Sequence, residues 1–343
     1  MRIDNPTIVY GLQNLDSSVL NQYSKVFVLT DLNTSSKCLP LLKSSLDFDF
    51  KEITVPDGEA RKTLSTVEQI LQRMIPADRK SLIINLGGGV ITDMGGLAAG
   101  LYKRGIDFIN IPTTILAMAD ASVGGKTGVN LDGYKNHAGF FSNPKMVILD
   151  TSFLNTLSYR QLLNGFAEMI KIGFIYDESL YQQLKLLKGP KNVDYSILKL
   201  AIDAKLKITD KDPFEQGERK LLNFGHTIGH GIESVAMDDS PDSLLHGEAV
   251  AIGMLAESFI SMKMNLLSEE DFFDLKDFVV KFYSDIISYV PNFERISRYL
   301  ISDKKNTFSG INFSLPISIG KGKTDLYPSE SLIRESLSFL QSL

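Results

Sequence analysis

Short apolar, β-branched segments alternate with helix-like segments through the first half of the chain, and this alternation limits the folds open to it. The predicted strands are Lys25–Thr30, Phe50–Val55, Ser81–Leu86, Phe108–Ile111 and Lys145–Leu149. Helical patterns between them include Leu64–Met74 and Ile91–Lys103. A βαβα alternation of this kind predicts a parallel sheet with helices on both faces.

The second half of the chain has a different pattern, because helical periodicity replaces the strand-like segments after about Asp150. The predicted helices there include Gly165–Gly173, Asp194–Lys211, Thr227–Val235 and Glu248–Met262. One strand-like segment follows, Asn312–Ile319. We therefore expect an α/β domain over residues 1–150 and a mainly α-helical domain over residues 151–343.

The charge balance and cysteine content exclude several classes of protein. The 343 residues carry 36 Lys and Arg against 41 Asp and Glu, so the net charge of -5 disfavours a nucleic-acid partner. Cys38 is the single cysteine, which excludes an intramolecular disulfide and a cysteine-based zinc site. The sequence shows neither a secretory signal segment nor an apolar run of membrane-spanning length, so we expect a cytoplasmic protein.

A glycine-rich segment, Asn85–Asp93, follows one predicted strand and opens a predicted helix. Three consecutive glycines allow close approach of the backbone to a ligand, and a helix N-terminus offers N–H groups to phosphate. A plain tight turn would also favour glycine. The segment matches neither GxGxxG nor the Walker A pattern, but its place at the carboxyl end of a strand favours dinucleotide binding. Asp31, at the end of the first predicted strand, could then bind a ribose hydroxyl.

Three of the four histidines fall within twenty-one positions. His226 and His230 are four residues apart and share a helix face if the segment is helical. His246 stands where another helix is predicted to begin, and Glu168 precedes all three. Histidines at this spacing commonly bind zinc, often with a carboxylate, although an isolated pair more often forms structural hydrogen bonds. From spacing alone, His226 and His230 would both be ligands.

Five cationic residues are candidates for binding an anionic substrate: Lys126, Lys135, Lys171, Lys205 and Arg219. We expect them in short glycine-containing segments rather than on periodic helix faces. A typical lysine is solvated. Grouped with a metal and a nucleotide loop, however, these side chains could bind a phosphate and a carboxylate.

Taken together, these segments resemble the 3-dehydroquinate synthases from about Val26 to Gly320. The motifs that carry the resemblance are Pro56–Lys62, Gly87–Asp93, Tyr102–Gly105, Ile111–Thr114, Asp120–Asn130, Lys135–Asn136, Ala167–Lys171, Leu222–His230, His246–Gly253 and Asp303–Lys305. Their order and spacing make the resemblance highly specific.

The resemblance implies an N-terminal Rossmann-like domain, an all-α C-terminal domain, bound NAD, a divalent metal (zinc or cobalt) and a homodimer. The implied reaction converts 3-deoxy-D-arabino-heptulosonate 7-phosphate to 3-dehydroquinate and phosphate, a step of the shikimate pathway of aromatic amino acid biosynthesis. NAD oxidises the substrate transiently, phosphate leaves by β-elimination, the hydride returns, and an intramolecular aldol step closes the ring.

The resemblance also assigns roles to individual residues. The implied metal ligands are Glu168, His226 and His246, which leaves His230 for proton transfer. The other implied catalytic and substrate-binding residues are Glu215, Lys126, Arg104 (supplied across the dimer), Asn136, Lys171, Lys205, Arg219, Asn223 and Lys304, with Lys305 as an alternative to Lys304. The implied cofactor contacts are Asp31, Glu59, Lys62, Gly88, Gly89, Val90, Asp93, Thr113, Thr114, Asp120, Lys135 and Thr156.

Three other interpretations are open. A related sugar-phosphate cyclase, making 2-deoxy-scyllo-inosose or a valiolone, would share the NAD and metal sites but accept a substrate without the carboxylate. A metal alcohol dehydrogenase similar to glycerol dehydrogenase would release NADH steadily. A binding protein on an inactive fold would not need the complete set of ligands and bases. The presence of Lys126, Lys205, Arg219 and Asn223 favours the carboxylate-bearing substrate.

Overall fold

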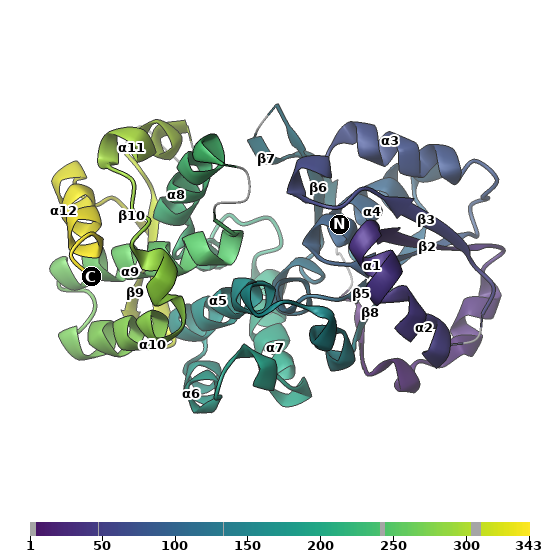
Figure 1. Ribbon diagram of the computed structural model, residues 1–343, viewed down its shortest axis with the longest axis horizontal. Coiled ribbons are helices and arrows are strands. Elements are labelled where there is room, and N and C mark those ends of the chain that lie inside the picture. The colour runs from purple at the N-terminus through teal and green to yellow at the C-terminus, as the bar shows by residue number, and fades with distance from the viewer. Residues whose placement is uncertain (1–4, 47, 133, 241–243, 303–309) are drawn as a thin grey trace. The chain divides into compact units, whose positions relative to one another are not determined.

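All five predicted strands of the first half are present in the computed structural model, which describes residues 5–46, 48–132, 134–240, 244–302 and 310–343 (Figure 1). The chain divides into two compact units, Met1–Ser158 and Tyr159–Leu343. The division follows a short 3₁₀ helix, η6 (Thr151–Thr156), which belongs to the first unit. The first unit therefore extends a few residues beyond the predicted boundary at residue 150.

Within the described residues, the first unit contains a six-stranded parallel sheet of order β1-β8-β5-β4-β2-β3. Its strands are β1 (Thr7–Tyr10), β2 (Val26–Asp31), β3 (Lys51–Val55), β4 (Leu82–Gly87), β5 (Asp107–Pro112) and β8 (Met146–Leu149). β1 was not predicted from the sequence. It has four residues at the sheet edge and none of them is fully buried, so it lacks the apolar pattern of the central strands.

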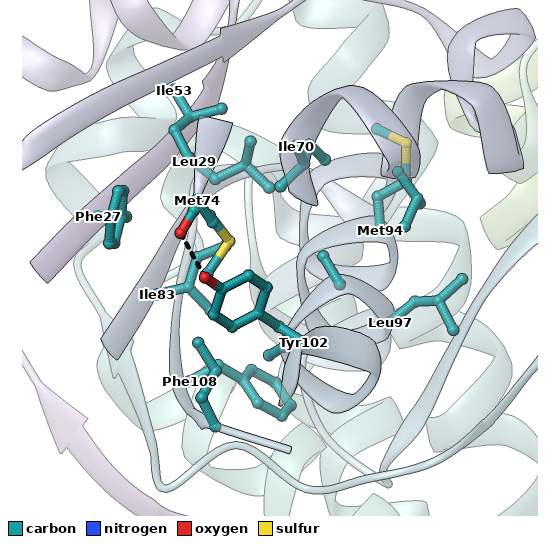
Figure 2. Packing of buried hydrophobic residues seen from close by; sticks show 14 of the residues in the cluster. Phe27, Leu29, Ile53, Ile70, Met74, Ile83, Met94, Leu97, Tyr102 and Phe108 are labelled. Carbon is teal, nitrogen blue, oxygen red and sulfur yellow. Dashed lines mark hydrogen bonds between the residues drawn. The ribbon is translucent and has the colours of Figure 1, made fainter. Parts of the chain in front are cut away.

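Helices pack on this sheet through large apolar side chains. The helices of the first unit are α1 (Leu32–Lys37), α2 (Leu39–Ser45), α3 (Leu64–Arg73) and α4 (Gly89–Leu101). Figure 2 shows Leu29 and Ile83 of the sheet packed with Ile70 of α3 and Met94 of α4. Each such side chain contributes about 1.5–3 kcal/mol when it leaves water. This core fixes the start of α4, and with it the glycine-rich segment, against the carboxyl end of β4.

A separate two-stranded antiparallel sheet lies beside α4. The pair is the hairpin of β6 (Lys126–Leu131) and β7 (Tyr134–Phe141). Neither strand was predicted, because both are rich in glycine and polar residues. The hairpin contains several of the candidate site residues.

The second unit is mainly helical, as predicted. Its helices are α5 (Tyr159–Tyr176), α6 (Glu178–Leu186), α7 (Tyr195–Lys211), α8 (His226–Asp239), α9 (His246–Lys263), α10 (Glu269–Ile287), α11 (Phe293–Ser302) and α12 (Glu330–Leu340). β9 (Phe313–Ser318) confirms the predicted strand. It pairs with β10 (Lys321–Leu326), whose residues are alternately exposed and half-buried and which was not predicted. In the part of the chain that the structure describes, no helix has the length and apolarity needed to cross a membrane.

Helix α9 is the central element of the second unit. Its residues from Gly247 to Ser261 are all buried, and it packs against α5, α8, α10 and α12. A helix that is apolar on every side must be surrounded by other elements. Because α8 begins at His226 and α9 begins at His246, this packing brings two of the three clustered histidines to neighbouring helix N-termini.

Candidate active site

Glu168 and three histidines meet inside the second unit. The Oε1 atom of Glu168, on α5, lies 3.3 Å from His226 Nε2 and 3.1 Å from His246 Nε2. The ring centroids of His226 and His230 are 5.0 Å apart, so the two side chains share a face of α8 as predicted. Each histidine has a ring nitrogen within 4.8 Å of one on each of the other two. Imidazole nitrogens and a carboxylate oxygen at this spacing suit zinc and similar divalent ions.

Two sets of three donors are possible in this cluster. One consists of the three histidines, and the other replaces His230 with Glu168. His226 and His246 belong to both sets. Glu168 is only 1% exposed, and one of its oxygen atoms already faces both rings. A buried carboxylate in this position fits a cation well.

The second ring nitrogen of each shared ligand also has a partner. His226 Nδ1 lies 3.1 Å from the carbonyl oxygen of Phe224, and His246 Nδ1 lies 3.3 Å from Glu233 Oε2. Such partners set the tautomer and orientation of metal-binding histidines. Glu233 was not identified from the sequence, although it follows His226 by seven residues and therefore lies on the same face of α8.

Charges within the cluster shift its pKa values in opposite directions. Burial opposes ionisation of Glu168, but the Lys171 ammonium and His226 outweigh it and hold the pKa of this carboxyl well below its usual value. Burial and nearby Lys171 lower the pKa of His226 to about 4. Burial also acts against protonation of His246, but Glu233 and Glu168 raise its pKa to about 9. The cluster therefore holds an ionised carboxylate at neutral pH.

Lys171 forms an ion pair with Glu168 on the same helix, and its side chain is 2% exposed. Lys205, in the middle of α7, is also buried. The expectation that the cationic residues lie off the helix faces was therefore wrong for both. In the structure each of these two lysines lies on a buried face of its helix.

Helix α5 also holds the start of α9, where His246 lies. Arg160 donates two hydrogen bonds of 2.7 Å to the two carboxylate oxygens of Glu248. Glu248 accepts from the backbone N–H of Leu245 at 2.7 Å, and Asn164 Oδ1 accepts from the N–H of Gly247 at 2.6 Å. Because these contacts flank His246 on both sides, they fix its position relative to Glu168.

The segment between α7 and α8 carries further predicted residues. Asn223 donates a 2.8 Å hydrogen bond to Glu215 Oε1, and Arg219, 3% exposed, donates to the Pro213 carbonyl oxygen at 2.7 Å. Asp212 shapes this loop, because its carboxylate accepts from the N–H groups of residues 216, 217 and 219. The structure thus brings Glu215, Arg219 and Asn223 into one loop held by a carboxylate.

The glycine-rich segment of the first unit has the predicted geometry. β4 ends at Gly87 and α4 begins at Gly89. Gly88 occupies the N-cap position and, as a glycine, offers no side chain to cap this helix. The residues Gly88, Gly89 and Val90 thus form an uncapped helix N-terminus, as phosphate binding requires.

A hydrogen-bond network joins several predicted cofactor residues to the β6–β7 hairpin. Lys62 donates at 2.6 Å to both Asp93 Oδ2 and Asn136 Oδ1. Asn130, which sequence reasoning did not identify, donates to Glu59 at 2.8 Å and accepts from the Asn136 N–H at 2.9 Å. Burial acts against the charge on Lys62, but Asp93 and Glu59 raise its pKa above the usual value. One hydrogen-bonded cluster of the first unit therefore contains Glu59, Lys62, Asp93 and Asn136.

The remaining predicted residues lie in several elements. Asp31 accepts from the Thr34 N–H at 2.7 Å and so caps α1. Thr113 and Thr114 follow β5, Asp120 lies in the π-helical turn η5 (Ala117–Ala121), and Thr156 ends η6. Lys126 begins β6, Lys135 lies in β7, and exposed Arg104 ends η4 (Tyr102–Arg104) with a φ of 71°. Lys304 and Lys305 lie outside the described residues.

Comparison with known proteins gives matches across both units. The family model described as 3-dehydroquinate synthase N-terminal matches residues 52–164, and the C-terminal model matches residues 165–306. The chain belongs to the 3-dehydroquinate synthase family. A 3-dehydroquinate synthase from Campylobacter jejuni is 42% identical over 312 residues, covering 87% of this chain and 88% of that protein. One from Parabacteroides distasonis is 39% identical over 334 residues, covering 96% and 94%.

Solved structures agree with the family at the level of the fold. The 2-epi-5-epi-valiolone synthase of Streptomyces hygroscopicus, solved with NAD+ and Zn2+ bound, has a TM-score of 0.87 and 26% identity, covering 100% of this chain and 98% of that one. A 2-deoxy-scyllo-inosose synthase solved with carbaglucose-6-phosphate, NAD+ and Co2+ has a TM-score of 0.82 and 26% identity, covering 97% and 98%. A probable glycerol dehydrogenase from Sinorhizobium meliloti shares the fold at 14% identity and a TM-score of 0.63, covering 99% and 98%.

Proposed function

We propose that this protein is a 3-dehydroquinate synthase, which converts 3-deoxy-D-arabino-heptulosonate 7-phosphate to 3-dehydroquinate and phosphate. The observation that carries the proposal is the match to this family across both units, together with the Glu168–His226–His246 cluster. In the cell the reaction belongs to the shikimate pathway, and we place the protein in the cytoplasm.

The proposed metal ligands are Glu168, His226 and His246, with zinc or cobalt as the ion. Their support is the donor set itself: two imidazoles and a buried carboxylate, each imidazole with an outer hydrogen-bond partner. When bound, the ion supplies Lewis-acid chemistry at an oxygen of the substrate. His230 is then left to accept or return a proton beside the ligands, with Glu215 and Lys126 completing the catalytic set.

The proposed NAD site is the uncapped start of α4 and the network around Lys62. The contacts are Asp31, Glu59, Lys62, Gly88, Gly89, Val90, Asp93, Thr113, Thr114, Asp120, Lys135 and Thr156. NAD serves as a transient hydride acceptor, so the reaction produces no net NADH. The backbone N–H groups of α4 bind and orient the pyrophosphate.

The proposed substrate contacts are cationic or amide side chains: Arg104, Asn136, Lys171, Lys205, Arg219, Asn223 and Lys304. Arg219 provides a planar fork suited to a carboxylate, whereas each lysine acts as a point charge toward phosphate or carboxylate. We propose that Arg104 comes from the second subunit of a homodimer. Its exposure and left-handed backbone conformation are compatible with a side chain presented outward.

A second candidate function is a cyclase reaction on a sugar phosphate that lacks the carboxylate. The similarity to the valiolone synthase structure favours it. The two candidates are separated by supplying purified protein, NAD and zinc with either the heptulosonate phosphate or a neutral sugar phosphate. Phosphate release and dehydroquinate formation from the first substrate alone support the synthase. Turnover of the neutral substrate alone supports the second candidate.

A further inference from the structure

Glu257 is a fully buried carboxylate on α9 that the proposed chemistry does not use. Its exposed fraction is 0%. Its Oε2 accepts a 2.6 Å hydrogen bond from the backbone N–H of Gly225, and its Oε1 accepts one of 2.9 Å from the N–H of Ile228. These N–H groups belong to the N-cap and third residue of α8. A side chain of α9 therefore caps the helix that begins with His226.

The start of α8 needs a cap from elsewhere because the N-cap position is restricted to glycine. Gly225 has a φ of 77°, in the left-handed region, and a Cβ there would lie 2.7 Å from Met254 Cγ. Conversely, a Cβ on Gly253 would lie 2.0 Å from the Gly225 carbonyl oxygen. The two helices approach too closely for residue 225 to carry the polar side chain that usually caps a helix. Glu257 follows Gly253 by one helical turn and supplies the acceptors instead.

This contact connects the two histidine-bearing helices. His226 is the first residue of α8, between the two N–H groups that Glu257 holds. His246 is the first residue of α9, the helix that carries Glu257. A shift of the α8 N-terminus relative to α9 would change the distance between the two rings.

We propose that Glu257 is a positioning residue of the metal site, which holds the first turn of α8 so that His226 and His246 converge on one ion. The inference rests on the proposed metal ligands. It adds a role for a residue that touches neither the ion nor the substrate.

The test is to measure metal affinity of Glu257→Gln by competition with a chromogenic chelator, alongside the visible spectrum of the cobalt-loaded protein. Glutamine keeps the size of the side chain but offers one oxygen acceptor in place of two. We expect affinity to fall by about 10- to 100-fold, the usual range when a residue that orients a metal ligand is changed, and the cobalt bands to shift. Ser258→Ala, the neighbouring buried position on α9, is the control and should match wild type.

The outcomes separate this inference from the proposed function. A wild-type protein that binds neither zinc nor cobalt contradicts the proposed metal site itself. If wild type binds metal and folded Glu257→Gln binds it equally well with an unchanged cobalt spectrum, Glu257 only stabilises the fold and the inference is overturned. If the Gln variant does not fold, Glu257→Asp tests the same point, because it keeps the carboxyl group but its shorter side chain cannot reach both N–H groups. An Asp variant with wild-type affinity and spectrum also overturns it.

Discussion

The Glu233 carboxylate lies 3.3 Å from Nδ1 of His246, on the opposite side of the ring from Glu168. An ionised carboxylate can only accept, so His246 donates from Nδ1 to Glu233, and a metal that binds Nε2 displaces the proton that the raised pKa keeps there in the metal-free protein. Glu233→Gln removes the charge that favours this arrangement. We expect metal affinity to fall about 10- to 100-fold, measured by chelator competition. Asp239→Asn, at the far end of α8, should leave affinity unchanged. Equal affinity in wild type and Glu233→Gln would show that the contact does not tune the ligand.

The division of roles between the two histidines of α8 is open to a direct comparison. His226→Ala removes a donor common to both possible ligand sets, so we expect zinc content, measured by atomic absorption, to fall close to zero. His230→Ala should keep the metal and lose rate by about 100- to 10,000-fold, the usual contribution of a proton-transfer group. Equal loss of metal in both variants would contradict the assignment of Glu168 as the third ligand.

The Arg160–Glu248 pair should contribute to the stability of the second unit. Arg160→Met leaves the buried Glu248 carboxylate without two charge-assisted hydrogen bonds, and we expect a loss of about 2 kcal/mol in the free energy of unfolding. Urea denaturation of the metal-free protein measures this loss. Arg334→Met, which breaks exposed pairs with Glu294 and Glu330, is the matched control and should cost less than about 1 kcal/mol. A similar small loss in both variants would contradict the structural role of the first pair.

Ionisation of Asp212 should make the stability of its loop depend on pH. Partial burial raises its pKa, but the backbone N–H groups of residues 216, 217 and 219 outweigh this and lower it. The ionised carboxylate thus stabilises the folded loop above its ordinary pKa of 3.8, and this contribution is lost as pH falls through the lower folded value.

The corresponding variant is Asp212→Asn. At pH 7 we expect it to lower kcat/KM by about 10-fold, a loss of about 1.4 kcal/mol, while metal content stays normal because the ligands lie elsewhere. Between pH 5 and 3, the stability of this variant should fall less steeply with decreasing pH than that of wild type. Circular dichroism measures the unfolding. An unchanged kcat/KM would show that the loop does not depend on this carboxylate.

The sequence predicted the fold well where burial leaves a periodic pattern. The central strands are apolar on both faces, and the long helices of the second unit repeat apolar residues at helical spacing. β1 and the β6–β7 hairpin escaped prediction because edge position and polar residues hide the alternation. Asn130, in that hairpin, was missed for the same reason.

The candidate site could be predicted in part. The histidines stood out by their spacing, and the family motifs gave the remaining positions. The contacts that hold the ligands in place depend on tertiary packing. Glu257 accepts from Gly225 and Ile228, which are 32 and 29 positions away in the sequence, and Glu248 contacts Arg160 across 88 positions. The burial of Lys171 and Lys205 was also not predictable, because a lysine is ordinarily solvated and only the folded helices show which faces point inward.

The proposed reaction oxidises and then reduces the same molecule. The most direct measurement mixes purified protein, NAD, zinc and 3-deoxy-D-arabino-heptulosonate 7-phosphate, and follows phosphate, 3-dehydroquinate and absorbance at the NADH wavelength together. We predict equal amounts of phosphate and dehydroquinate, many turnovers per NAD, and no steady accumulation of NADH. Steady NADH production without phosphate release would identify a dehydrogenase and contradict the account.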